Sequence, residues 1–282
     1  MSTTPSPALR QDSARPSRRR GLLGFLSRLV PSRTPAGNLP TPRRLSAWAA
    51  YGTLLAIYLL VFGQSLAGQV MMMLSQGDAA VTAPAPDALW PAALATWARH
   101  ALLVLLACAA LWITARACRV GIREVFAPAP LGRRRQAWAV FAWTLTAYAV
   151  CMTGQSLLKG LLGAGDGGFQ METPGEMLRM AAMIGPTQIT TGFVEETVVV
   201  GCLVLLLAAA HRPAWEVGAV AAIAKTAYHA YYGWPVLALV PAALIAVWLY
   251  RRTGRLWPIV LGHAAYNALF TCLVVATALT TP

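Results

Sequence analysis

Long apolar stretches separated by short polar links make up most of the chain after residue 44. Seven stretches are candidates for membrane-crossing helices: Leu45 to Leu74, Trp90 to Ala115, Ala137 to Leu158, Met180 to Ala210, Val217 to Trp234, Pro235 to Tyr250 and Leu256 to Thr280. A helix needs about 20 apolar residues to cross the hydrocarbon core of a bilayer. The pattern therefore predicts an all-α fold, a polytopic transmembrane helical bundle with about seven membrane helices in one domain over residues 45–282.

The composition supports this class of protein. Hydrophobic residues make up 57% of the chain and charged residues only 12%. That balance is typical of an integral membrane protein and not of a large soluble domain. The five cysteines include no CxxC pair, so the sequence indicates neither a disulfide framework nor a cysteine-rich zinc site.

The basic residues gather in the amino-terminal tail and in every second link. The tail holds nine arginines, the 116–135 link six and the 251–255 link three, within a formal net charge of +13. If these segments face the cytoplasm, the positive-inside rule describes a multi-pass cell-membrane protein with its amino terminus inside and its carboxyl terminus outside. The charge then indicates contact with anionic lipid headgroups, and no nucleic-acid partner is expected.

The segments outside the apolar stretches have their own expected structures. Residues 1–44 are expected to form a disordered basic cytoplasmic tail, with a short interfacial helix over Leu22 to Val30. The stretches Ala79 to Pro91 and Gly160 to Gly175 are rich in Ala and Pro or in Gly, which predicts external loops. The second loop is expected to lead into a helix along the membrane surface, Pro174 to Ile184.

Two adjacent carboxylates, Glu195 and Glu196, interrupt the fourth apolar stretch. No positive charge lies within ten residues of them on either side. A charge at the centre of a bilayer costs at least about 2.5 kcal/mol. An unpaired acid there would tend to take up a proton instead. A chain that keeps two such groups together is expected to use them, so the pair is a hypothesis for a functional site.

Other polar groups recur at helical spacing in the fifth and seventh stretches. Lys225 and His229 are four residues apart, as are His263 and Asn267, so each pair is predicted to share one helix face. Singly, a histidine can bond a neighbouring carbonyl and Asn267 can join two helices. Together with the glutamates they predict one buried site, because polar groups in hydrocarbon satisfy one another more easily than each does alone.

The depth of these residues in the membrane tests whether they can meet. At 1.5 Å per residue, Glu196 and His229 each lie about 25 Å along their helices from Arg212, so these two are expected at the same level. His263 lies only about 12 Å from Arg255. The last helix therefore reaches the site only if it is tilted or if the 251–255 link dips inward.

Three sequence motifs accompany these residues. They are Glu195-Glu196, then Ala227-Tyr228-His229-Ala230-Tyr231-Tyr232-Gly233, then Gly254-Arg255-Leu256-Trp257-Pro258 followed by His263-Ala264-Ala265-Tyr266-Asn267. As a set, over about residues 188–270, they resemble the CPBP family. That family comprises the type II CAAX prenyl endopeptidases and their bacterial relatives, often called intramembrane metalloproteases or Abi proteins.

The resemblance implies hydrolysis of a peptide bond in a membrane-associated protein or peptide. The family's EExxxR motif places catalytic acids on Glu195 and Glu196, its FxxxH motif places the histidine on His229, and its HxxxN motif falls on His263 and Asn267. A water activated between Glu195 and His229 would attack the peptide bond. His263 and Asn267 would donate hydrogen bonds to the oxyanion. A carboxylate in apolar surroundings is a competent base, so the chemistry is consistent with the residues themselves.

Two positions depart from the family motifs. Val200 stands where EExxxR has arginine, and Lys225 stands where FxxxH has phenylalanine. The arginine would sit one helical turn from Glu196 and could neutralise it. We expect Lys225, one turn from His229, to supply the missing positive charge to Glu196.

The cofactor is open from the sequence. The family's common title implies zinc, and Glu195, His229 and His263 form a possible His2Glu ligand set. However, the chain has no HExxH motif, and His263 has the alternative role of oxyanion donor. The sequence favours a metal-independent glutamate mechanism and leaves zinc as the alternative.

Two other function classes remain open. The bacterial relatives are linked to bacteriocin protection, and the two motif departures fit a catalytically idle membrane scaffold or self-immunity protein. A proton-coupled transporter would use the buried Glu, His and Lys side chains as a proton relay. That third class is less attractive because the chain shows no detectable inverted repeat.

Overall fold

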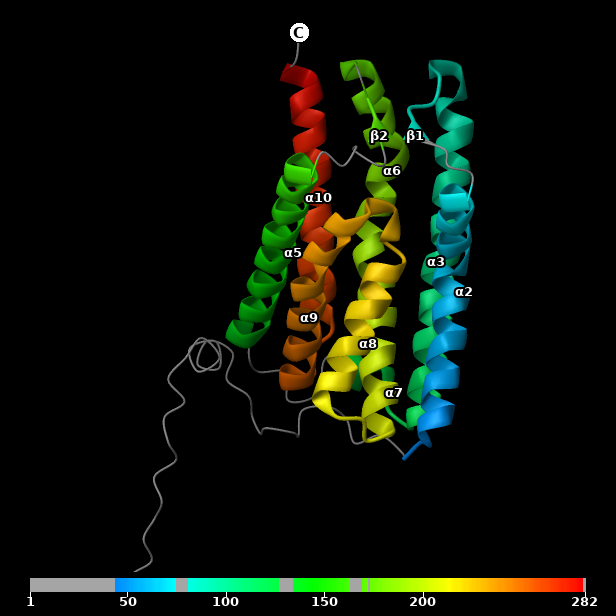
Figure 1. The fold of residues 1–282 in the computed structure, drawn as a ribbon, viewed down its shortest axis with the longest axis vertical. Helices are drawn as coiled ribbons and strands as arrows, with labels where there is room; N and C mark the ends of the chain where they lie inside the picture. Colours follow the sequence, from blue (N-terminus) through cyan, green and yellow to red (C-terminus); the bar gives the residue numbers. More distant parts are fainter. Residues whose placement is uncertain (1–43, 75–80, 127–133, 163–168, 172, 281–282) are drawn as a thin grey trace, which may run out of the picture.

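The computed structural model describes residues 44–74, 81–126, 134–162, 169–171 and 173–280, and confirms a helical membrane bundle (Figure 1). Its elements are α2 (Ala47–Leu74), β1 (Val81–Thr82), η1 (Pro86–Ala88), α3 (Leu89–Cys118), α4 (Ile122–Phe126), α5 (Arg134–Leu162), β2 (Phe169–Gln170), α6 (Pro174–Glu195), η2 (Glu196–Cys202), α7 (Leu203–Ala209), α8 (Ala214–Ala227), η3 (Ala230–Tyr232), η4 (Trp234–Leu239), α9 (Val240–Thr253) and α10 (Trp257–Thr280). The two-residue strands β1 and β2 pair in parallel between the loops at one end. The predicted tail and its helix over Leu22 to Val30 lie outside the described residues, apart from Arg44.

Six of the described helices are long and apolar enough to cross a membrane, judged by length and composition. They are Ala47–Met71, Pro86–Cys118, Arg134–Leu161, Pro174–Ala209, Trp234–Thr253 and Trp257–Thr280. The predicted fifth stretch, Val217 to Trp234, differs because its helix α8 has 14 residues and ends at Ala227. Such a helix is only about 21 Å long. In Figure 1, α8 rises from the lower end, the chain turns inside the bundle, and α9 returns to the same end.

The predicted surface helix over Pro174 to Ile184 is instead the first part of α6, which continues through η2 and α7 to Ala209. A capping box starts it. The Thr173 side chain accepts from the Glu176 N–H at 3.2 Å, and the Glu176 carboxylate accepts from the Thr173 N–H at 3.0 Å. Pro174 occupies the first turn, where its missing N–H costs nothing. The first part is therefore continuous with the candidate membrane span Pro174–Ala209 and does not form a separate helix.

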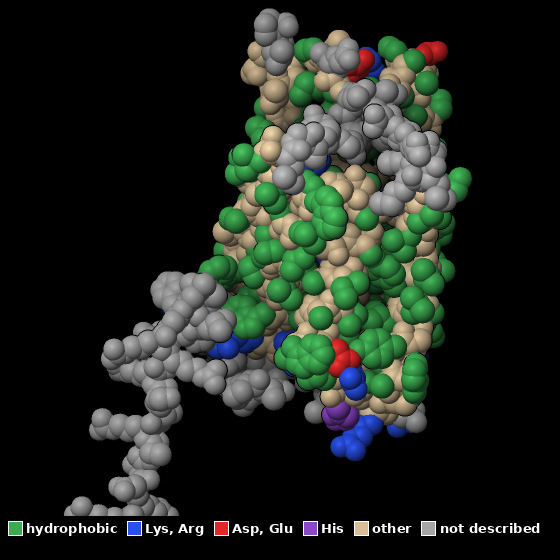
Figure 2. All heavy atoms as spheres, viewed as in Figure 1, with side chains coloured by type: hydrophobic (Ala, Val, Ile, Leu, Met, Phe, Trp, Pro, Cys, Tyr) green, Lys and Arg blue, Asp and Glu red, His purple; other side chains and the backbone are tan. Residues whose placement is uncertain are grey.

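Ten of the twelve described arginines lie at one end of the bundle, the lower end in Figure 2, whereas Arg99 and Arg179 lie in the first parts of α3 and α6. By their positions at helix ends these are Arg44, Arg116, Arg119, Arg123, Arg134, Arg135, Arg212, Arg251, Arg252 and Arg255. The chain enters α2 at this end, and α10 finishes at the opposite end (Figure 1). The positive-inside rule predicts orientation from this kind of difference, an excess of basic residues at one end of the bundle.

Two glycines let α10 pack tightly between α6 and α5. A Cβ atom on Gly192 of α6 would lie 2.7 Å from the backbone nitrogen of Ala264. A Cβ atom on Gly262 of α10 would lie 2.8 Å from the backbone oxygen of Phe141 on α5. Small residues at helix interfaces in membranes allow this close backbone approach. They hold α10 against both neighbours at the level of His263.

The link between α9 and α10 dips into the protein. Residues 253–256 are all buried, and Arg255 keeps only 5% of its surface exposed. This inward dip is one of the two geometries that the depth argument requires. In Figure 1 the lower end of α9 lies above the lower end of α7, as such a dip requires.

Candidate active site

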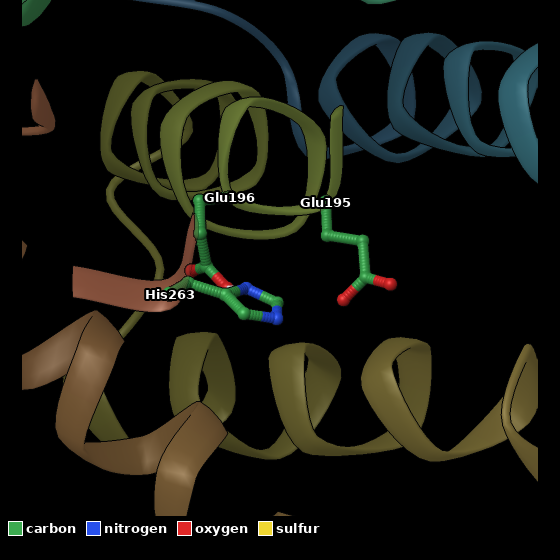
Figure 3. Close-up of side chains that lie close together, drawn as sticks. All are labelled: Glu195, Glu196 and His263. Atoms are coloured by element: carbon green, nitrogen blue, oxygen red, sulfur yellow. The ribbon is translucent and has the colours of Figure 1, made fainter. Parts of the chain in front are cut away.

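Five of the six predicted polar residues meet in one cluster, which we call the acid cluster. Its members are Glu195, Glu196, Lys225, His229 and His263, from α6, η2, the end of α8 and α10. Glu196 and Lys225 are 1% and 2% exposed, so the charges are inside the protein. In Figure 3, Glu196 and His263 point toward one another, and Glu195 points from the same helix into the adjacent space.

Lys225 lies between the two carboxylates. Its Nζ atom is 2.5 Å from Glu195 Oε2 and 3.3 Å from Glu196 Oε1. The ammonium therefore contacts both acids, with the shorter distance to Glu195 and not to Glu196. Val200, at the position of the family's arginine, is 1% exposed and contributes only apolar packing to η2.

The two oxygens of Glu195 have different surroundings. Oε2 accepts hydrogen bonds from Lys225 and from the Tyr228 hydroxyl, the latter at 2.7 Å. Oε1 faces Nε2 of His229 at 3.8 Å, which is too long for a direct hydrogen bond. Among the hydrogen bonds of the described residues, none reaches Oε1. One oxygen of this carboxylate is thus held, and the other faces an imidazole.

Glu196 is held by three donors on a single oxygen. Its Oε1 accepts from the Tyr148 hydroxyl, from Nδ1 of His263 at 2.8 Å and from Lys225. The rings of Tyr148 and His263 stack with centroids 3.8 Å apart and planes 13° from parallel. Charge-assisted hydrogen bonds are the strong ones in proteins. This carboxylate therefore ties α5, α8 and α10 to the helix that carries it.

His229 lies in the turn directly after α8 and not on the helix itself, because α8 ends at Ala227. The last carbonyls of a helix lack backbone partners, and side chains supply donors to them here. Tyr58 donates to the Ala224 carbonyl at 2.7 Å, Nδ1 of His229 to that of Lys225 at 3.0 Å, and Gln69 to that of Tyr228 at 2.6 Å. Helix α2, which carries Tyr58 and Gln69, thus supports the turn from outside the predicted motifs.

The hydrogen bond to the Lys225 carbonyl assigns the tautomer of His229. A carbonyl oxygen only accepts, so Nδ1 of His229 carries a hydrogen. A neutral His229 then presents the lone pair of Nε2 toward Glu195 Oε1. Two acceptors that face one another at 3.8 Å are suited to share a water that donates to both.

Asn267 is the predicted site residue that the described contacts do not bring to the glutamates. It lies on α10 one turn after His263, and its Nδ2 donates to the backbone carbonyl of Gln188 on α6 at 2.8 Å. This bond is the interhelical contact that a lone asparagine in a membrane helix often makes. The amide has a second hydrogen, which this contact does not use.

The two carboxylates of the cluster lie where the helix changes from α-helical to π-helical. Glu195 is the last residue of α6, and Glu196 starts the π-helical segment η2. Single π-helical turns inside α-helices occur frequently at functional sites. Gly201 within η2 faces the side chain of Leu256 in the buried link, where a Cβ atom would lie 2.8 Å from it.

A metal ion has a possible ligand set in the cluster, but not the predicted one. Ligand atoms of Glu195, Glu196 and His263 lie within 4.8 Å of one another. Among the described residues, this set contains Glu196 and does not contain His229, which the sequence predicted as a ligand. The Lys225 ammonium contacts both of these carboxylates. It would repel a second cation at short range, so the donor set fits lysine better than zinc.

Sequence reasoning missed two site tyrosines. Tyr228 precedes His229 in the motif, so its position next to a polar residue in an apolar stretch was a usable signal. Tyr148 lies on α5, where no motif marks it. Only the packing of α5 against α10 places its hydroxyl on Glu196.

Residues 178–269 match the family model described as Rce1-like, type II CAAX prenyl endopeptidase Rce1-like. This part of the chain is an Rce1-like domain. It begins at residue 178, before the predicted start at residue 188, and it contains every member of the acid cluster. Tyr148 and helix α2 lie outside it. No curated protein and no solved structure matches the chain. The match over residues 178–269 supports the predicted resemblance to this family, and the six apolar helices support a multi-pass membrane protein.

Proposed function

We propose that this protein is an integral-membrane endopeptidase that hydrolyses a peptide bond of a membrane-associated protein or peptide. The observation that carries the proposal is the pair Glu195 Oε1 and His229 Nε2, 3.8 Å apart in a buried cluster. A water between them would donate one hydrogen to each. It would then be oriented for attack, with a carboxylate ready to take its proton.

The reaction would proceed through a tetrahedral intermediate. The water oxygen bonds to the carbonyl carbon of the substrate while its proton passes to Glu195 Oε1. Asn267 and His263 would donate to the oxyanion, each worth roughly 3 kcal/mol in a dry site. In that role His263 is an imidazolium, with Nδ1–H on Glu196 and Nε2–H on the oxyanion. The carbon–nitrogen bond then breaks, and the proton on Glu195 moves to the leaving nitrogen.

We propose that this reaction needs no metal, because Lys225 already supplies a positive charge to both carboxylates. Zinc is the alternative, with Glu195, Glu196 and His263 as ligands that would polarise the water. Metal analysis of the purified protein, together with an activity assay in a chelator, separates the two. The proposal expects less than stoichiometric zinc and full activity. Stoichiometric zinc whose removal abolishes hydrolysis would contradict it.

The family name makes a CAAX-type carboxyl terminus the first substrate class to test. Membrane proteins from cells expressing the wild type are compared by mass spectrometry of their carboxyl termini with those from cells expressing Glu195→Gln. We expect carboxyl termini that are shortened only in the wild-type cells. Asp87→Asn, which removes an exposed carboxylate in η1, is the matched control. Identical termini in wild-type and Glu195→Gln cells would indicate the idle scaffold, and pH-gradient-dependent solute uptake would indicate the transporter.

We further propose that the arginine-rich end of the bundle faces the cytoplasm and contacts anionic lipid headgroups, with the carboxyl terminus outside. The distribution of arginines described above supports this orientation. Two of these arginines also lie over tryptophan rings, Arg116 at Trp112 and Arg252 at Trp248. Arginine and tryptophan at this level are typical of a membrane interface. A cysteine introduced at Thr280, the last residue of α10, in a variant without the five native cysteines should react with a membrane-impermeant thiol reagent in intact cells, and the absence of labelling would contradict the orientation.

A further inference from the structure

We infer that Tyr228 is a positioning residue: with Lys225 it holds Oε2 of Glu195, so that Oε1 is the oxygen that takes the proton from water. The inference rests on the proposed function and names the atom that performs its first step. It concerns a hydroxyl that neither the predicted motif roles nor the metal set includes.

The contacts on Glu195 divide its oxygens. Two donors, the Lys225 ammonium at 2.5 Å and the Tyr228 hydroxyl at 2.7 Å, converge on Oε2. Donors withdraw charge from the oxygen that they bind and fix the plane of the carboxylate. The lone pairs of Oε1 remain available, and this oxygen faces Nε2 of His229 at 3.8 Å. A carboxylate without this anchor would rotate and offer either oxygen, at varying distance from the imidazole.

Tyr228 is itself rigidly placed by a helix outside the Rce1-like domain. Its ring is 4% exposed and stacks on Phe62 of α2, with centroids 4.3 Å apart and planes 5° from parallel. Its carbonyl accepts from Gln69 of the same helix. Removal of the hydroxyl alone would leave this stacking and this backbone contact in place. Helix α2 therefore fixes the orientation of Tyr228, and the Tyr228 hydroxyl in turn fixes the Glu195 carboxylate.

The test uses the Tyr228→Phe variant of the full-length protein in lipid nanodiscs. Infrared difference spectra against the corresponding Glu195→Gln protein isolate the carboxylate bands of Glu195 in each background. We expect Tyr228→Phe to shift these bands, because one donor on Oε2 is lost. Tyr231→Phe is the matched control, since it removes a neighbouring hydroxyl that donates to neither glutamate among the described contacts, and it should leave the bands in place. Bands that are the same in Tyr228→Phe and wild type would overturn the inference.

A second readout separates positioning from general support of the fold. With an S-farnesylated CAAX-type peptide as the probe, Tyr228→Phe should lower kcat about tenfold or more and leave KM within about twofold. Equal kcat in the variant and the wild type would also overturn the inference. If the wild type cleaves no peptide in any assay, the proposed function fails. The infrared shift then still decides whether Tyr228 anchors Oε2 of Glu195.

Discussion

Glu195 and Glu196 are neighbours in the chain, yet their surroundings in the structure differ sharply. Glu196 Oε1 receives three donors, from α5, the end of α8 and α10. Glu195 has two donors on Oε2 and keeps Oε1 directed at an imidazole. Each carboxylate keeps one oxygen without a donor among the described contacts, but the free oxygen of Glu195 faces Nε2 of His229, with which it can share a water, while the three donors on Glu196 join helices. The comparison supports our proposal that Glu196 assembles the site and that Glu195 performs its chemistry.

Helix geometry explains how adjacent residues acquire such different partners. Successive side chains on a helix point about 100° apart. Glu196 is thereby directed at His263 on α10, and Glu195 at the turn that carries Tyr228 and His229. Lys225 is the residue common to both sides, because its ammonium contacts both carboxylates.

The largest stability effect is expected when Lys225 is removed. Lys225→Ala leaves two buried carboxylates without their shared cation, which should lower the free energy of unfolding by about 3 to 5 kcal/mol. Adding Glu196→Gln removes one of the uncompensated charges and should recover part of that loss. Reversible unfolding in mixed micelles measures both. A double variant no more stable than Lys225→Ala would show that Lys225 does not serve as the charge partner of Glu196.

Loss of the Tyr148 hydroxyl tests the Glu196 side of the comparison. Tyr148→Phe keeps the ring on His263 but removes one charge-assisted hydrogen bond, which should cost about 1.5 to 3 kcal/mol of unfolding free energy. Tyr266→Phe is the control, because it removes the hydroxyl of a tyrosine on α10 whose ring lies near that of Tyr148, and it should cost much less. Equal stability of the two variants in the same micelles would mean that the Tyr148 hydroxyl does not hold Glu196.

Gly192→Ala tests whether close packing sets the position of His263. The added methyl group would lie 2.7 Å from the backbone nitrogen of Ala264, so α10 must move away from α6. Overpacking of this kind costs typically about 1 to 3 kcal/mol. Gly154→Ala on α5, where a Cβ atom meets nothing within 4 Å, is the matched control. We expect a lower thermal midpoint only for Gly192→Ala, and the packing argument fails if the two midpoints agree.

The smallest expected effect lies at the arginine-rich end, away from the cluster. Hydrogen bonds from Arg212 and Tyr51 lower the pKa of Glu216. A carboxyl with a lowered pKa in the folded state stabilises the protein above its unfolded pKa of about 4.3, and this contribution is lost as the pH falls through the folded value. Glu216→Gln should therefore reduce stability slightly at pH 7 and not at low pH. Equal loss at both pH values would contradict this linkage.

The sequence predicted the helical bundle and all five members of the acid cluster, since isolated polar residues in apolar stretches have few partners other than one another. Glu195, Glu196, Lys225, His229 and His263 were found in this way. Tyr148 could not be found, because a tyrosine in a membrane helix carries no signal until its neighbours are known. The shortness of α8 was also hidden, since the apolar sequence continues through the turn after Ala227.

The depth of His263 shows the limit of counting residues along helices. A straight helix starting at Arg255 would leave His263 too close to the membrane surface. The buried link 253–256 resolves this, and such burial depends on packing against η2 that no local pattern encodes. The sequence shows Val200 in place of the motif arginine and Lys225 in place of the motif phenylalanine. That Lys225 contacts both carboxylates required the structure.

Peptide hydrolysis by Glu195→Gln tests the central claim most directly. The purified wild type, Glu195→Gln and the exposed-site control Asp87→Asn are assayed in nanodiscs with the S-farnesylated peptide, alongside their thermal midpoints. The assignment of Glu195 as the base predicts a fall in kcat/KM of about 10² to 10⁴ for Glu195→Gln, with the control at the wild-type rate and the folded state retained. A folded Glu195→Gln protein that hydrolyses the peptide at the wild-type rate would contradict it.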